Sequence, residues 1–552
     1  MIFLKQQKKI AKCIIGSILL SSILASCENE NLQDDFLTEQ PSNKVLSKEK
    51  INHFILETTD QQQKSFDWNM ATEEVLWSAI VHSNYEVMIG YKKDGWNDDE
   101  TRDYMFNYKK SLDKDIVDIK DNMIANILES NQTSTKTLKE EAIIEEADNL
   151  LSITAKISDL KTLKTLLSSP NLRYLEPMYD IYYNSHTEDY NAKDSGDLGC
   201  GEDNPRYDLR VNYDYINLHP GGKMGWNFKY HKIKETWDWG GITTKGTGKG
   251  IGVAILDTGL SHRQEQLIDG FSQGNQYMFN EGLVSNRIIR FSDQYGSNGS
   301  YRIDDCGHGT ALSGVIASPR AKYGIHGVAY GCNLYNYRAN SDVFINGTRD
   351  ITAVANSFIS AANTSNVRII SMSMGSVSRS SRIADAIVYA YRKGKLIFSA
   401  AGTIELGSFV SGQYPNLANI VFPANMTEYN GDVVYGVTGI RTNYTACTKC
   451  VKGKNVDFAV VMEQLNGTQA LATGKGGLYT TTIGGSSVAT ATMAGIAALV
   501  WGKNTTLPRA DLVLALKQKS DYPFRTNPIF GYGKVNTLEA YKYFDLFGGL
   551  GL

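Results

Sequence analysis

The sequence has 552 residues, of which 42% are hydrophobic and 21% are charged. This length exceeds one ordinary domain and predicts roughly two to four units, at least one of them with a sizeable core. The composition is that of a soluble globular protein, and a formal net charge of -3 leaves no basic footprint for nucleic acid. We therefore expect no nucleic-acid partner.

The N-terminus has the pattern of a secretion signal. Several lysines precede an apolar run from Cys13 to Leu24, which is too short for a permanent membrane-spanning helix. The run ends in Leu24-Ala-Ser-Cys27, which resembles the lipobox of bacterial lipoproteins. The resemblance implies a signal peptide over residues 1–26 and acyl chains on Cys27 that anchor the protein to a membrane. The alternative is a simple cleavage site in which Cys27 is incidental.

The residues that follow Cys27 bear on location. They are acidic and resemble the surface-export tag of some Gram-negative lipoproteins, although a plain solvated tether fits equally well. We expect a lipid-anchored protein of the bacterial cell envelope, at the outer membrane or cell surface, with the periplasmic face as the alternative. Residues 27–85 are interpreted as a spacer or N-terminal extension.

Residues 86–184 predict a small α+β unit in the order strand, helix, two strands, helix, strand. One long helical stretch is expected from about Glu100 to Leu128, and the last strand is Leu172-Arg-Tyr-Leu-Glu-Pro177. This order is that of a ferredoxin-like unit, a common fold with many uses. Residues 185–224 are rich in Gly, Asp, Asn and Pro, which is typical of an exposed, cleavable linker.

Residues 225–545 alternate short apolar runs with helical stretches. Such alternation predicts an α/β domain with a mostly parallel central sheet and helices on both faces. The expected strands are residues 252–256, 334–337, 368–373, 395–400 and 433–437.

Three short motifs carry candidate chemistry in this domain. Asp257-Thr-Gly ends an apolar strand, His308-Gly-Thr opens a small-residue helix, and Ser487 lies at the start of another such helix. Each motif alone is weak, because Asp-Gly turns, glycine-flanked histidines and serine helix caps are common. An aspartic protease would need a second equivalent carboxylate, and the only candidate, in Asp194-Ser-Gly196, lacks a strand that leads into it.

Together, the three motifs resemble those of subtilisin-like serine proteases. The chain order Asp, His, Ser is that of the subtilisin triad, and Gly485-Ser-Ser-Val-Ala-Thr-Ala matches the serine motif with Ser487, rather than Ser486, as nucleophile. The resemblance implies a serine endopeptidase that acts on peptides or proteins, with Asp257, His308 and Ser487 as its catalytic residues. Weaker matches in the family's order include residues 325–329, 370–375, 422–424 and 531–536.

The last strand of the small unit also resembles the end of the inhibitory prodomain of this family, which commonly reads Val-x-Tyr-Val-Glu-Pro. The resemblance implies that residues 86–184 are a prodomain that inhibits its own peptidase domain until the linker is cut. We expect an autoprocessed zymogen that is otherwise a monomer.

The oxyanion hole departs from the family pattern. The family supplies an asparagine in Ala-Ala-Gly-Asn, whereas this chain has Ser399-Ala-Ala-Gly-Thr403. In subtilisin, the loss of such a donor costs about 100- to 1000-fold in turnover, although a threonine hydroxyl or a water can substitute in part. We expect a slower or narrower protease, with an inactive, peptide-binding pseudoprotease as the alternative.

Other expected features concern substrate and ions. By resemblance, Ser373, Met374 and Gly375 form an edge strand that pairs with substrate, and Ile404 contributes an apolar wall to the primary specificity pocket. The loop at residues 318–322 carries two cations where many relatives bind calcium, so no calcium is expected there, although other calcium sites stay open. No other cofactor is implied.

Of the seven cysteines, five remain when Cys13 is removed with the signal peptide and Cys27 is acylated. An odd number allows at most two disulfides within the chain. Cys447 and Cys450 have the spacing of a small disulfide loop or of half a metal site, but no second pair completes a zinc set. We therefore favour disulfides or free thiols over a metal.

Overall fold

The structure is a computed structural model that describes residues 45–130, 140–181, 200, 205–219, 221–239, 246–267, 287–296, 303–321, 323–403, 421–426 and 432–545. The predicted signal peptide, Cys27 and Ile404 lie outside the described residues. Among the helices in the described part of the chain, none has the length and apolar character needed to cross a membrane.

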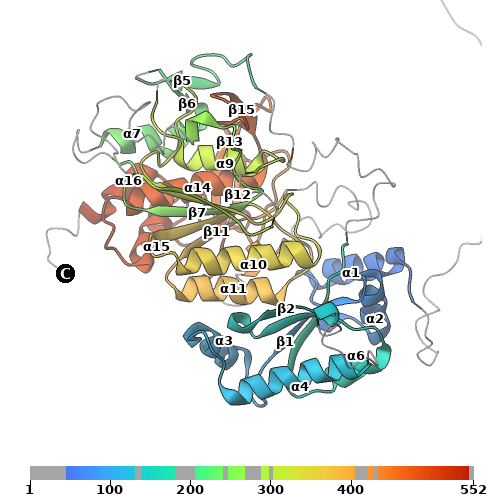
Figure 1. Cartoon of the computed structure of the whole chain (residues 1–552). Helices are drawn as coiled ribbons and strands as arrows, with labels where there is room; N and C mark the ends of the chain where they lie inside the picture. Colours follow the sequence, from blue (N-terminus) through green and yellow to red (C-terminus); the bar gives the residue numbers. More distant parts are fainter. Residues whose placement is uncertain are drawn as a thin grey trace, which may run out of the picture. The chain divides into compact units, whose positions relative to one another are not determined.

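A seven-stranded sheet organises residues 205–545, which we call the α/β domain (Figure 1). Its strand order is β13-β12-β11-β10-β7-β9-β8, and every neighbouring pair is parallel. The prediction of an α/β fold with a mostly parallel sheet is confirmed. The strands are β7 (Gly252–Asp257), β8 (Ile289–Asp293), β9 (Asn333–Arg338), β10 (Val367–Met372), β11 (Leu396–Ala400), β12 (Tyr435–Arg441) and β13 (Phe458–Glu463).

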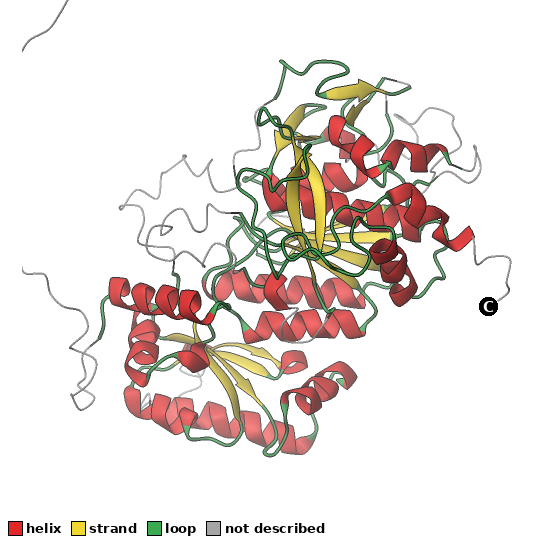
Figure 2. Cartoon of the chain, turned by 180° about the vertical axis from the view of Figure 1, so that it is seen from behind, coloured by secondary structure: helices red, strands yellow, loops and turns green. Residues whose placement is uncertain are grey.

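Helices cover both faces of this sheet (Figure 2). On one face lie α9 (His308–Ala317) and α14 (Gly485–Trp501), which are built from small and apolar residues and are almost wholly buried. Small residues let these helices approach their neighbours closely: a Cβ at Gly495 would lie 2.6 Å from the Val328 side chain. On the other face, α10 (Gly347–Asn363) and α11 (Ser381–Arg392) bury an apolar stripe.

Shorter elements complete the α/β domain. They are β5 (Tyr215–Asn217), β6 (Lys223–Gly225), η4 (Trp226–His231), α7 (Ile233–Asp238), η6 (Ala424–Met426), β14 (Ala470–Thr473), β15 (Thr480–Ile483), α15 (Arg509–Gln518), α16 (Thr537–Lys542) and η7 (Tyr543–Asp545). Strands β14 and β15 form a hairpin that leads directly into α14.

Residues 45–181 form a second layered structure, which we call the N-terminal module. Its four-stranded sheet has the order β2-β3-β1-β4 with antiparallel neighbours, which is the strand order of a ferredoxin-like unit. Its elements are α1 (Lys48–Gln62), η1 (Trp68–Met70), α2 (Glu73–His82), β1 (Glu86–Tyr91), α3 (Asp98–Asn107), α4 (Lys114–Ser130), β2 (Ile143–Ala147), η2 (Asp148–Leu150), β3 (Ser152–Lys156), α6 (Leu160–Leu167) and β4 (Leu172–Pro177).

Two features of the module differ from a reading of its sequence. The stretch expected as one helix from about Glu100 to Leu128 is two helices, α3 and α4, and Lys110 between them has a left-handed φ of 73°. Residues 45–85, interpreted as a spacer or extension, supply α1 and α2. Ile51 and Ile80 in these helices are fully buried in the same core as the module's sheet.

Candidate active site

Asp257 and His308 form a buried hydrogen-bonded pair at the carboxyl end of the sheet. Asp257 is the last residue of β7 and His308 is the first residue of α9, and their side chains are 0% and 2% exposed. His308 Nδ1 lies 2.7 Å from Asp257 Oδ1. The backbone N–H of Thr258 also donates to this oxygen at 2.8 Å. A fixed carboxylate on Nδ1 orients the imidazole and leaves Nε2 for chemistry.

Asp304, which was not predicted, joins the aspartate and histidine motifs. It is 3% exposed. Its Oδ1 accepts from Thr258 Oγ1 at 2.8 Å and from the Gly307 N–H at 2.7 Å. Its Oδ2 accepts from the Thr310 N–H at 2.7 Å and from Thr310 Oγ1 at 2.6 Å. This one buried carboxylate therefore fixes both the turn after β7 and the first turn of α9.

The neighbouring carboxylate, Asp305, has no such role. Asp305 is exposed, and Lys475 Nζ contacts its backbone oxygen rather than its carboxylate. The available signal was the placement of an aspartate four residues before the first helical residue, because such a carboxylate can cap the free N–H groups of a helix start.

Ser487 lies in the first turn of α14, and its neighbours hold that turn in place. The Gly402 N–H donates to Ser486 Oγ at 3.2 Å, and Ser373 Oγ donates to the carbonyl of Ser487 at 3.3 Å. Ser486 is 1% exposed, whereas Ser487 is only half-buried. The Ser486 hydroxyl is thus used inside the fold, and Ser487 is the more accessible of the two.

Thr403 lies beside the start of the same helix. A Cβ at Gly485, whose φ is 77°, would lie 2.8 Å from Thr403 Cγ2, so glycine is required there both for its backbone and for its size. Thr403 is half-buried and forms an antiparallel bridge with Cys450, and the Val451 N–H donates to the Gly402 carbonyl at 3.1 Å. The residue predicted at the oxyanion position therefore lies near the helix that carries Ser487.

Two disulfides flank these elements. Cys447 and Cys450 are bonded, which agrees with the preference for a disulfide over a metal site. Cys200 is bonded to Cys306, two residues before His308, and so fixes one residue of the predicted linker region beside the histidine motif. Cys332 is a buried free thiol. Within the described ranges, no group of three or more His, Cys, Asp and Glu is placed to hold a metal ion.

In the loop at residues 318–322, where no calcium is expected, two backbone carbonyls contact side-chain nitrogens of the protein. Gln266 Nε2 lies 3.5 Å from the Pro319 carbonyl, and His326 Nε2 lies 3.3 Å from the Ala321 carbonyl. These oxygens would be candidate calcium ligands. The absence of calcium at residues 318–322 stays a prediction.

The predicted substrate-binding strand has partners of its own. The Gly375 N–H donates to Val343 at 3.1 Å, and its carbonyl accepts from Ile345 at 3.0 Å. Ser373 and Met374 are buried, at 5% and 2% exposure. Substrate pairing at Gly375 would require these two bonds to open, so strand addition at residues 373–375 stays a prediction.

Comparison with known sequences places this chain in a family. The profile of the subtilase family matches residues 248–533, a little over half of the chain. This segment contains the seven-stranded sheet and all three candidate catalytic residues. The chain belongs to the subtilase family.

Curated relatives agree with this assignment. The chain is 26% identical over 322 residues to the minor extracellular protease Epr of Bacillus subtilis (strain 168), covering 58% of this chain and 42% of that protein. It is 29% identical over 294 residues to alkaline elastase YaB of Bacillus sp. (strain YaB), covering 53% of this chain and 65% of that protein. Subtilisin Savinase of Lederbergia lenta is 28% identical over 294 residues, covering 53% of this chain and 91% of that protein. The chain thus spans less than two thirds of the length of Epr and of alkaline elastase YaB.

Among solved structures, MycP1 from Mycobacterium smegmatis aligns with a TM-score of 0.44 at 20% identity, covering 62% of this chain and 88% of MycP1.

Proposed function

We propose that this chain is a serine endopeptidase that cleaves peptide bonds through an acyl-enzyme on Ser487. The observation that carries the proposal is the buried 2.7 Å contact between His308 and Asp257 at the carboxyl edge of a subtilase sheet. Ser487 supports it as a half-buried serine on the small-residue helix that packs against α9.

The proposed roles follow from this geometry. His308 Nε2 takes the proton of Ser487 Oγ as the oxygen attacks the carbonyl carbon, and later gives this proton to the leaving amine. Asp257 holds the imidazole in the required tautomer and stabilises its positive charge. The Ser487 N–H and the Thr403 hydroxyl donate to the oxyanion. Water then releases the acyl group by the same steps in reverse.

The matched test compares three forms of the full chain. Wild type is expected to cut its own linker between about residues 185 and 225 and then to hydrolyse peptides, whereas Ser487→Ala does neither. Ser360→Ala, a serine in α10 on the opposite face of the sheet, serves as the control and keeps both activities. A wild-type chain that neither processes itself nor cleaves peptides would leave the pseudoprotease as the better account.

The N-terminal module is proposed to be the intramolecular inhibitor of this peptidase. Its sheet is docked on α11 through buried ion pairs: Arg173 donates to both oxygens of Asp385 at 2.5 and 2.8 Å. Arg382, which is fully buried, donates to both oxygens of Glu145 at 2.7 Å. Bidentate pairs of this kind fix orientation as well as adding affinity.

Glu176 adds a cap to the same helix. The Ser381 N–H at the start of α11 donates to the two carboxylate oxygens of Glu176 at 2.9 and 3.2 Å. Burial raises the pKa of Glu176 to about 7, against the opposing effects of the Ser381 hydrogen bonds and the nearby Arg379 charge. A carboxyl that is removed from water at this contact makes the docking sensitive to pH.

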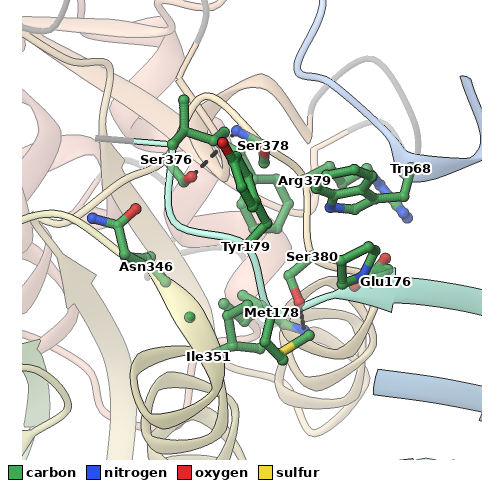
Figure 3. A pocket seen from close by; sticks show the side chains of 16 residues that line it. Trp68, Glu176, Met178, Tyr179, Asn346, Ile351, Ser376, Ser378, Arg379 and Ser380 are labelled. Carbon is green, nitrogen blue, oxygen red and sulfur yellow. Dashed lines mark hydrogen bonds between the residues drawn. The ribbon is translucent and has the colours of Figure 1, made fainter. Parts of the chain in front are cut away.

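Beyond β4, the chain runs from Pro177 to Ile181 along the α/β domain. Pro177, Met178, Tyr179 and Ile181 line a cavity of about 30 Å³ together with residues of the α/β domain such as Asn346 (Figure 3). The same cavity is lined by Ser376 and Ser378, which come directly after the predicted substrate strand Ser373–Gly375 in the sequence. This position of residues 177–181 supports the proposal that the linker is presented to the active site.

Secretion and lipid anchoring are proposed from the N-terminal sequence. The relative Epr is named as an extracellular protease, in keeping with a location outside the cytoplasm. Expression in a bacterial host with radiolabelled palmitate is expected to label wild type but not Cys27→Ser. Equal labelling of both forms, or of neither, would contradict anchoring through Cys27.

A further inference from the structure

A segment before the ferredoxin-like unit pairs with the α/β domain as a short strand. The Phe66 N–H donates to the Val377 carbonyl at 3.0 Å, and the Phe66 carbonyl accepts from the Arg379 N–H at 2.7 Å. Phe66 and Ser378 thus form a parallel bridge. The partner residues come from the stretch between Gly375 and helix α11, so this contact begins two residues after the predicted substrate strand.

The side chain of Phe66 is buried at this contact. It is 0% exposed. Its ring packs edge-on against the rings of Trp68 and Phe54, with distances between ring centroids of 5.1 and 6.1 Å. Val377 of the α/β domain belongs to the same core cluster. One aromatic side chain therefore joins the core of the module to a residue of the other domain.

The residues before and after Phe66 in the sequence make polar contacts with the α/β domain. Asn425 Nδ2 donates to Ser65 Oγ at 2.6 Å, and Asn425 is 1% exposed. Arg379 Nη1 lies 3.4 Å from Asp67 Oδ2. Lys454 Nζ donates to the carbonyl of Gln63 at 3.2 Å. Residues 63–68, which we call the anchor segment, thus meet several separate parts of the α/β domain.

The anchor segment also holds the tail that leaves β4. The Trp68 ring packs edge-on against Tyr179 at 6.2 Å, and the Tyr179 hydroxyl donates to Asn52 Oδ1 at 2.9 Å. Figure 3 shows Trp68, Tyr179, Ser378 and Arg379 around the cavity that this tail lines. The tail is therefore enclosed between residues of the N-terminal extension and the α/β domain.

We propose that the edge Val377–Arg379, which pairs with Phe66 and whose Val377 shares a core cluster with it, is a second binding site of the α/β domain for the N-terminal module. The anchor segment occupies this site by parallel strand addition. The first site is the docking of the module's sheet on α11, so the module binds at two places, and its release requires both to open. The inference rests on the proposed function in one respect, namely that the linker is cut and the module must then dissociate.

The test measures release of the module without using the activity of the chain. The full chain carries Ser487→Ala and a recognition sequence for an unrelated protease placed between residues 183 and 199. This position lies before Cys200, because the Cys200–Cys306 disulfide would otherwise keep the two pieces joined. After the cut, dissociation of the module from the immobilised α/β domain is followed by surface plasmon resonance.

Phe66→Ala is expected to weaken binding at least about 30-fold, the effect of removing a buried aromatic anchor. Trp77→Ala, which removes another aromatic that packs on the module core and contacts Tyr85, is the control and is expected to change binding less than about 3-fold. Asn425→Ala leaves the module sequence intact, so it tests the same site even if Phe66→Ala fails to fold. It removes one hydrogen bond and is expected to weaken binding about 3- to 10-fold.

The inference is overturned if Phe66→Ala dissociates no faster than Trp77→Ala, if Asn425→Ala binds like the parent, or if the module of the parent leaves as soon as the linker is cut. Because the chain in this assay is inactive by design, these outcomes are separate from a failure of the proposed peptidase activity.

Discussion

Replacing Asp304 with asparagine tests how His308, the proposed catalytic base, is held in position. The carboxylate accepts four hydrogen bonds, from Thr258 Oγ1, the Gly307 N–H, and the N–H and hydroxyl of Thr310. An amide of the same shape has one acceptor oxygen and presents an NH₂ group in place of the other. Whichever way the amide turns, a backbone N–H of either Gly307 or Thr310 faces a donor.

The expected loss of stability follows from the hydrogen bonds that Asp304→Asn removes. A buried N–H without an acceptor costs about 1–3 kcal/mol, and loss of the negative charge weakens the remaining bonds. We expect Asp304→Asn to lower the free energy of unfolding by about 2–4 kcal/mol. Because the Thr258 hydroxyl also accepts from the Gly309 N–H, the turn and the helix start shift together relative to Asp257. A displacement near 1 Å lowers kcat by about 100-fold.

Two measurements check this prediction: urea unfolding, and kcat and KM on a peptide substrate. The expected signature is a fall in kcat with little change in KM, since Asp304 positions the histidine and does not face substrate. Asp305→Asn removes the same charge from the neighbouring exposed residue and is expected to behave like wild type. If Asp304→Asn kept kcat within about 3-fold of wild type, or if Asp305→Asn lost as much, the positioning role of Asp304 would be refuted.

Three further predictions concern the oxyanion position, the docked module and the linker. Thr403→Asn is expected to raise kcat about 10-fold or more on peptides, because an amide donor is supplied beside Ser487; an unchanged or lower kcat would mean that the hole is built differently. The Glu176 carboxyl has a pKa raised to about 7 when docked and an ordinary value of 4.5 when free. The docked state therefore holds more protons between these values, so module affinity is expected to fall as pH rises from 4.5 to 7, and this dependence should vanish in Glu176→Gln. On a denaturing gel without reductant, a chain that is cut between residues 183 and 199 is expected to run as two separate pieces, whereas a chain that is cut between residues 201 and 204 is expected to run as two pieces only after the Cys200–Cys306 disulfide is reduced.

Much of the α/β domain could be predicted from the sequence because its signals are local. Buried parallel strands are short apolar runs, and β7 and β10 begin and end within a residue or two of the expected limits. The small-residue helices after His308 and around Ser487 were equally visible. The residues of the triad motifs stand at the ends of these elements, where the topology of a parallel sheet brings its loops together.

What could not be predicted depends on contacts between distant residues. Cys200 and Cys306 are 106 residues apart, and sequence alone does not pair them. Phe66 sits in a polar stretch without strand periodicity, and its partner Val377 lies in the other domain. Between α3 and α4, Lys110 has a left-handed backbone, which its residue type does not predict.

The central claim is that Ser487 is a nucleophile activated by His308. A fluorophosphonate tests it directly, because an activated serine oxygen bonds to phosphorus and expels fluoride, and the adduct can be located by peptide mass spectrometry. After the linker is cut, we expect a single adduct on Ser487 in wild type and none in His308→Ala. An adduct on Ser486, or no adduct on wild type once the module is removed, would contradict the assignment.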